Sequence, residues 1–218
     1  HNGAHLAALF KLVAMYFSEV TFIFGSTLQR FNTAIKTNKT PEECANLTLK
    51  EFNQFWEMHN KLFPMLNIPW KVIDWDSFRK NALFPDYLSE IEELYQKDKL
   101  FQKTFDDNAN LFIERLKKRN ELAVPEELAK KYCLDYLKEE CAIMRFWPEE
   151  NCQYEIYPKK RAPAMQITYD RFIKAENPHS LKRLEVKFKS KKPILIPEKQ
   201  KKLALESEKN CSNTINKP

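Results

Sequence analysis

Residues 131–158 read KYCLDYLKEECAIMRFWPEENCQYEIYP, a helical segment followed by a short strand that ends in a Tyr-Pro pair. Within the helix, Tyr136 and Glu140 are four residues apart, and side chains at this spacing share one face. Glu139 then lies off that face. A second phenol, Tyr157, follows seventeen residues after Glu140. A carboxylate and two phenols around one point predict a site that holds an ammonium group and moves a proton.

The rest of the chain alternates short apolar runs with long helical patterns. The predicted strands are TFIF at 21–24, PWKVIDW at 69–75 and QYEIY at 153–157. The predicted helices cover 4–18, Pro41 to about Leu62 with Thr40 as N-cap, Pro85 to about Arg119, a segment starting at Pro125, and 165–176. Strands separated by long helices predict an α/β fold, with a parallel sheet covered by helices on both faces.

Composition excludes several classes of protein. The chain has two glycines, Gly3 and Gly25, too few for a Walker loop or a dinucleotide fingerprint. Its five cysteines form no CxxC pair, which favours free thiols in a reducing compartment over a zinc ribbon or a disulfide framework. No apolar run reaches about 18 residues, so we expect no membrane helix. We find no metal-ligand set.

Length and charge set the domain organisation. A chain of 218 residues predicts one domain, over 1–186, followed by a Lys-rich tail over 187–218 that we expect to be disordered. The net charge of +6 is compatible with a polyanionic partner and equally with an ordinary basic surface.

The order of these segments resembles that of the cyclodipeptide synthases up to about residue 175. The resemblance is carried by TFIFGST (21–27), IPWKVIDWDSF (68–78), PDYLSEIEELYQKDKLFQKTFDDNANLFIERLKKR (85–119), YLKEECAIM (136–144) and YEIYPKKRAPAMQIT (154–168). The pair Tyr157-Pro158 resembles the branch of this family that has an X-Tyr-Pro signature.

This resemblance implies a fold and a chemistry. The fold would be Rossmann-like and related to the catalytic domain of class I tyrosyl- and tryptophanyl-tRNA synthetases. The activity would join two aminoacyl groups from aminoacyl-tRNAs into a diketopiperazine, by ping-pong transfer through a serine ester and without ATP. Tyr136 and Glu140 would hold the α-ammonium of the first aminoacyl group. Tyr157 would assist proton transfer near the reacting carbonyl.

One element of the family pattern is missing. The nucleophilic serine should come shortly before HNGAHL, yet the first serine is Ser18, within a predicted helix, and Ser26 follows the wrong strand. We expect the first strand and the serine to lie before His1. A non-catalytic tRNA- or RNA-binding relative is the alternative. A class I synthetase fragment is disfavoured because HNGAH is one residue too long for the HIGH motif and no lysine loop follows.

Further residues are candidates for contacts with substrate. The expected pocket residues are Glu155, Ile143, Phe22, Phe24 and Pro158. Glu155 shares a strand face with Tyr157 and would favour a cationic or hydrogen-bonding substrate side chain, unless it is a solvated strand-end residue. Core packing would explain Phe22 and Phe24 equally well. For tRNA phosphates the candidates are Arg115, Lys117, Lys118, Arg119, Lys182 and Arg183. We expect a cytoplasmic monomer that uses aminoacyl-tRNAs and needs no cofactor, metal or membrane.

Overall fold

The computed structural model describes residues 3–150, 152–157 and 160–186. The helices are α1 (Gly3–Tyr16), α2 (Arg30–Thr37), α3 (Pro41–His59), α4 (Trp75–Arg79), α5 (Phe84–Lys97), α6 (Lys99–Lys118), α7 (Glu126–Met144) and α8 (Pro163–Thr168). The strands are β1 (Val20–Phe24), β2 (Trp70–Asp74), β3 (Tyr154–Tyr157) and β4 (Lys182–Glu185). Short 3-10 segments are η1 (Thr27–Gln29), η2 (Asn60–Leu66) and η3 (Trp147–Glu150), and η4 (Tyr169–Ile173) is one turn of π-helix. The predicted tail over 187–218 lies outside the described residues.

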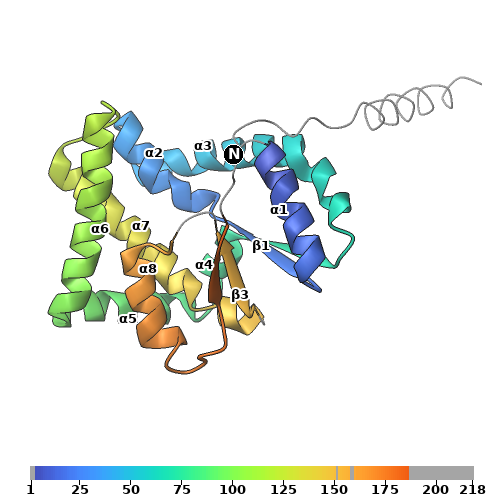
Figure 1. The fold of residues 1–218 in the computed structure, drawn as a ribbon. Coiled ribbons are helices and arrows are strands. Elements are labelled where there is room, and N and C mark those ends of the chain that lie inside the picture. Colours follow the sequence, from blue (N-terminus) through green and yellow to red (C-terminus); the bar gives the residue numbers. More distant parts are fainter. Residues whose placement is uncertain (1–2, 151, 158–159, 187–218) are drawn as a thin grey trace, which may run out of the picture.

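The described strands form two parallel pairs. β1 pairs with β2, with Val20 opposite Trp70, and β3 pairs with β4, with Tyr154 opposite Lys182. Figure 1 shows the strands between α1 on one side and the group formed by α5, α6, α7 and α8 on the other. The prediction of a parallel α/β fold is therefore confirmed. Strand β4 was missed because its sequence, KRLE, has no apolar run to mark it.

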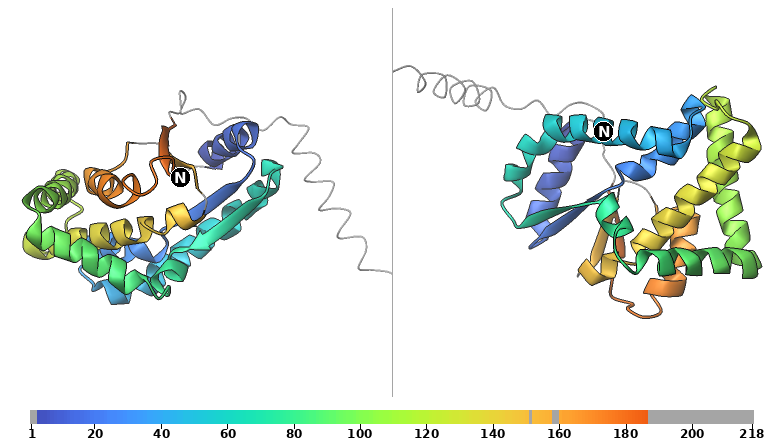
Figure 2. Two further views of the ribbon diagram at one scale, coloured as in Figure 1. Left: turned by 90° about the horizontal axis from the view of Figure 1, so that it is seen from below. Right: turned by 180° about the vertical axis from the view of Figure 1, so that it is seen from behind.

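Two hydrophobic clusters hold these elements together. The larger cluster joins α2, α5, α6, α7 and α8, and includes Phe101, Phe105 and Ile143. The smaller cluster joins α1 and η2 to β1 and β2. From the first helix and the residue after it, the cluster contains Leu6, Leu9, Phe10, Val13 and Phe17. The two further views in Figure 2 show α1 set apart from the helices around α7.

The apolar run of β1 divides between its two faces, because successive side chains of a strand alternate. Phe22 contacts Phe10 and Phe63, with ring centroids 5.3 Å and 5.0 Å apart. Phe24 contacts Phe52 and other aromatic rings of α3. Both phenylalanines therefore pack on the α1 and α3 side, and the opposite side of β1 is left to Thr21 and Ile23.

The helix predicted from Pro85 to about Arg119 is in fact two helices, α5 and α6, which meet at Asp98. The carboxylate of Asp98 accepts hydrogen bonds from the backbone N–H of Leu100 and Phe101, at 2.9 Å and 3.0 Å. Asp98 is thus the N-cap of α6, and its other oxygen pairs with Arg171 at 2.6 Å. The break lets α5 and α6 fold back against α7.

We expect Asp98→Ala to lower the free energy of unfolding by about 1–2 kcal/mol, because it leaves donors at the start of α6 without a partner. Urea unfolding followed by circular dichroism measures the loss. Asp107→Ala is the matched control, since Asp107 is an exposed aspartate of the same helix whose partner is Lys103. It should cost less than about 0.5 kcal/mol. Equal losses in the two variants would contradict the capping role.

None of the described helices combines the length and the apolar character needed to cross a membrane.

Candidate active site

Helix α7 brings Tyr136 and Glu140 to the wall of a cavity of about 250 Å³. Strand β3 supplies Glu155 and Tyr157 to the same cavity. The remaining lining residues come from β1, the turn after it and neighbouring elements: Thr21, Ile23, Gly25, Leu28, Gln29, Trp75, Trp147, Cys152, Tyr154, Ile156 and Leu181. The carboxylate and the two phenols picked out in the sequence therefore border one cavity.

Tyr136 is a partly buried phenol with polar neighbours. Its hydroxyl lies close to the Glu140 carboxylate and to the side chain of Gln29. Burial raises the pKa of Tyr136 well above its usual value, and the charge of Glu140 adds to the effect. The phenol therefore stays protonated and can donate to Glu140 or to a bound ligand.

Glu140 is the group in this cavity that titrates near neutral pH. Burial, and then the charge of Glu155, raise its pKa to about 7. The neighbouring phenol of Tyr136 and the positive charge of Arg183 act in the opposite direction, lowering the pKa. A carboxylate with this pKa can accept a proton from an ammonium group and return it at little cost in free energy.

Tyr157 is more open to solvent, with 52% of its surface exposed. Partial burial and the charge of Glu140 raise the pKa of its phenol, while Arg183 lowers it. The phenol is therefore protonated at neutral pH and suits a proton donor or relay better than a base.

Glu155 lines the cavity, but two arginines already engage its carboxylate. Oε2 accepts from Nε and Nη2 of Arg161 at 2.9 Å and 2.7 Å. Oε1 accepts from Nη1 of Arg183. We expected Glu155 to attract a cationic substrate side chain. In the structure, however, Arg161 and Arg183 already neutralise its carboxylate.

Glu139 points away from the cavity into a buried ion pair. Its Oε1 accepts from Nη1 of Arg30 at 2.9 Å, and Oε2 accepts from Nη2 of the same guanidinium. The indole N–H of Trp75 also donates to Oε1, at 2.9 Å. These contacts fix the rotation of α7 about its axis and so turn the face with Tyr136 and Glu140 toward β3.

Comparison with solved structures shows which proteins the whole chain is similar to. A cyclodipeptide synthase from Fluoribacter dumoffii matches 85% of this chain and 83% of its own, with 30% identity and a TM-score of 0.79. The chain belongs to the cyclodipeptide synthase family. A cyclodipeptide synthase from Candidatus Glomeribacter gigasporarum, solved bound to Phe-tRNAPhe, matches 90% of this chain and 84% of its own, at 20% identity and a TM-score of 0.71.

More distant similarity supports the fold. A Mycobacterium tuberculosis protein, whose structure related cyclodipeptide synthetases to type I tRNA synthetases, matches 78% of this chain and 72% of its own. Its identity is 14% and its TM-score 0.57. A scan of protein-family models and a search of curated proteins gave no match. The synthase therefore has the Rossmann-like fold that its sequence predicted.

Several residues expected in the pocket of the synthase lie elsewhere. Ile143 is fully buried in the larger cluster, one helical turn past the cavity. Phe22 and Phe24 pack on the other face of β1, and Thr21 and Ile23 take the places at the cavity. Pro158 lies outside the described residues.

The candidate tRNA contacts are divided between two places. At the end of α6, Arg115, Lys118 and Arg119 are exposed, and Lys117 pairs with Glu114 and Glu126. Lys182 is exposed on β4, whereas Arg183 turns inward to Glu155. The tRNA-binding role of these residues stays a prediction. Arg183 differs from the other candidates because its side chain pairs with Glu155.

Sequence reasoning missed Gln29, Trp75, Trp147 and Arg161 as site residues. Gln29 follows the carboxyl end of β1, an edge where open α/β sheets bind ligands, and this rule could have found it. Trp147 lines the cavity, and its indole N–H has no hydrogen-bond partner within the described part of the chain. This indole N–H is buried.

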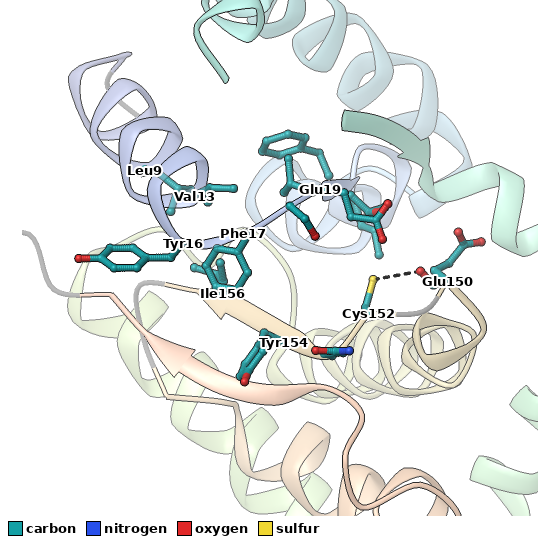
Figure 3. A pocket seen from close by; sticks show the side chains of 15 residues that line it. Leu9, Val13, Tyr16, Phe17, Glu19, Glu150, Cys152, Tyr154 and Ile156 are labelled. Atoms are coloured by element: carbon teal, nitrogen blue, oxygen red, sulfur yellow. Dashed lines mark hydrogen bonds between the residues drawn. The ribbon is translucent and has the colours of Figure 1, made fainter. Parts of the chain in front are cut away.

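A second cavity of about 420 Å³ lies beside the first, between the two strand pairs. Figure 3 shows Leu9 and Val13 of α1 on one side of it and Tyr154 and Ile156 of β3 on the other. The two cavities share Thr21, Ile23, Cys152, Tyr154 and Ile156. We call this second cavity the inter-pair slot.

Proposed function

We propose that the chain joins two aminoacyl groups from aminoacyl-tRNAs into a cyclic dipeptide, by ping-pong transfer through an aminoacyl-serine ester and without ATP. The observation that carries the proposal is the convergence of Tyr136, Glu140 and Tyr157 on one cavity in a member of the cyclodipeptide synthase family. The relative solved with Phe-tRNAPhe supports aminoacyl-tRNA as the substrate.

Glu140 and Tyr136 are proposed to bind the α-ammonium of the first aminoacyl group. A carboxylate and a phenol oxygen on one helix face give two hydrogen-bond acceptors for this group. An α-amino group has a pKa near 7.7–8.0, close to the value of about 7 for Glu140. Glu140 can therefore take the proton and release the neutral amine that the next step requires.

The amine then attacks the ester carbonyl of the second aminoacyl-tRNA. A C–N bond forms, the ester C–O bond breaks, and the ribose hydroxyl of the tRNA leaves with the proton. In the last step the new terminal amine attacks the seryl ester, and the serine oxygen leaves as a hydroxyl. Tyr157, with its protonated phenol, is placed to pass the proton to that oxygen.

The inter-pair slot supports a place for the serine. Among the described strands, β1 pairs with β2 alone and β3 with β4 alone, so each has an edge free for pairing. We propose that a further strand, which carries the nucleophilic serine, lies in the slot parallel to both. Its carboxyl end would come beside Gly25 and Tyr157, because parallel strands end at the same edge.

A serine at that end would reach the cavity that holds Glu140. Ser26 is a poor substitute, since it is 5% exposed and donates its hydroxyl to Asp74 at 3.0 Å. We also propose that the protein belongs to the X-Tyr-Pro branch and acts as a cytoplasmic monomer. Light scattering of the purified protein measures the oligomeric state.

Expression of the complete reading frame in a bacterium, with mass spectrometry of the medium, tests the function directly. We expect diketopiperazines to appear, and purified protein to form a covalent aminoacyl adduct with labelled aminoacyl-tRNA. Binding of aminoacyl-tRNA with neither product nor adduct would instead show a non-catalytic tRNA-binding relative and refute the proposal.

We expect Tyr157→Phe to slow diketopiperazine release by about 10²–10⁴-fold, the usual contribution of a positioned proton donor. The first aminoacyl adduct should still form, and the dipeptidyl adduct should accumulate, because only the proton relay is lost. Intact-protein mass spectrometry distinguishes the two adducts. Tyr95→Phe is the control, because it removes a phenol that lies away from the cavity and donates to Asp106. Normal release by Tyr157→Phe would remove this phenol from the mechanism.

A further inference from the structure

Strands β3 and β4 bring a glutamate and an arginine face to face beside the active site. Glu155 and Arg183 are register partners in this parallel pair, and their side chains form an ion pair. The guanidinium of Arg183 also lies over the ring of Tyr157, 5.0 Å from its centroid. Arg183 therefore contacts both Glu155, which lines the cavity, and Tyr157, one of the proposed catalytic phenols.

Arg161 fixes the glutamate from the opposite side. Its side chain is 3% exposed and forms a two-point contact with Oε2 of Glu155. It also donates to the carbonyl of Leu181 at 2.9 Å and to Gln166 at 3.2 Å, and it stacks 4.0 Å from the ring centroid of Tyr169. With its donors spread over these partners, Arg161 has little freedom to move, and Glu155 is held in turn.

We propose that Arg183 is a positioning residue of the synthase, held by Glu155 and Arg161 so that its charge acts on Glu140 and Tyr157. The proposal rests on the function proposed above and extends it to residues outside the reacting set. Glu155 then serves to hold Arg183, and selection of a cationic substrate side chain is not its role.

The charges around the cavity explain why such a residue is needed. Glu155, Arg161 and Arg183 form a cluster of charged side chains on the β3–β4 side of the cavity, and Glu140 lies on the α7 side. The groups that face Glu140 are Tyr136 on its own helix, Glu155 and Tyr157 on β3, and Arg183 on β4. Gln29 contributes a neutral amide through Tyr136, and the thiol of Cys141 follows Glu140 in the chain.

Among these groups Arg183 is the cation that favours the carboxylate form of Glu140. Burial and Glu155 both raise the pKa of Glu140, and Arg183 lowers it. Removing the positive charge should therefore leave a larger fraction of Glu140 protonated at neutral pH, and the protonated form cannot accept the ammonium proton.

The test is a titration of Glu140 by ¹³C NMR in the complete protein, with Glu140→Gln identifying the signal. In Arg183→Gln the midpoint should rise by about one pH unit, the lower end of the effect of a nearby opposite charge. In Arg183→Lys it should stay close to that of the unaltered protein. Lys182→Gln is the control, because it removes an exposed cation from the neighbouring position of the same strand.

The rate of diketopiperazine formation gives a second readout. A one-unit rise from a midpoint near 7 reduces the ionised fraction at pH 7 about five-fold, so Arg183→Gln should lose about five-fold activity there and regain it toward pH 8. Loss of activity with an unmoved midpoint, in a folded protein, would overturn the proposal. The titration needs no turnover, so a protein without synthase activity would refute the proposed function and still test Arg183.

Discussion

We expect the replacement of Glu140 with glutamine to reduce diketopiperazine formation by about 10²–10⁴-fold and to make the protein more stable at pH 8. The loss of product follows because glutamine cannot take a proton from the bound ammonium, and a positioned base contributes about 10²–10⁴-fold to a rate. The gain in stability follows because the carboxylate is ionised inside the cavity at a cost that the neutral amide avoids.

The pH dependence of this gain has a definite sign. The pKa of Glu140 rises from 4.5 in the unfolded chain to about 7 in the folded protein. Below pH 4.5 both states are protonated and the carboxyl contributes no difference. Between the two values the unfolded state releases its proton first, so stability falls as pH rises, and it levels off above pH 7. The largest difference is at most about 3 kcal/mol.

Melting temperatures of the two proteins at pH 5 and pH 8 measure the effect. We expect similar values at pH 5 and a higher one for Glu140→Gln at pH 8, by about 2–4 °C for each kcal/mol. Full synthase activity in Glu140→Gln would exclude the carboxylate from the mechanism. A stability difference that does not change with pH would exclude its raised pKa.

Replacing the preceding residue has the opposite effect on stability. Glu139→Gln should lower the free energy of unfolding by about 3–5 kcal/mol, because it leaves the guanidinium of Arg30 buried beside a neutral group. Both side chains of the pair are less than one-tenth exposed, at 9% and 8%. The indole N–H of Trp75 shares the same acceptor, so the damage extends to α4.

A double-mutant cycle with Arg30→Met isolates the ion pair. Removing both charges should cost less than the sum of the two single changes, since no buried charge then stays unpaired. Urea unfolding at pH 7 gives the free energies. A loss below about 1 kcal/mol for Glu139→Gln, or strict additivity in the cycle, would contradict a buried ion pair of this strength.

The sequence predicted what depends on local spacing. The interval of four residues between Tyr136 and Glu140 placed both at one cavity, and it correctly turned Glu139 away. The caps at Thr40 and Pro125 began their helices as expected. These features follow from helix geometry and from the first turn alone.

Features that depend on tertiary packing could not be predicted from the sequence pattern. The run TFIF is apolar at nearly every position, so its pattern did not reveal that Phe22 and Phe24 face α1 and α3. The break at Asp98 needs a side chain to replace a helical hydrogen bond, and the surrounding periodicity hid it. The contact between Glu155 and Arg183 joins residues 28 apart and depends on the register of a strand without an apolar signal.

The inter-pair slot also carries a liability. Strands whose backbone amides and carbonyls lack a neighbour are templates for any extended polypeptide of suitable character. Among the described strands, the edges of β1 and β3 beside the slot can in this way recruit an extended segment, such as one from a nascent or misfolded chain. Whatever covers these strand edges during synthesis therefore also protects the soluble yield of the protein.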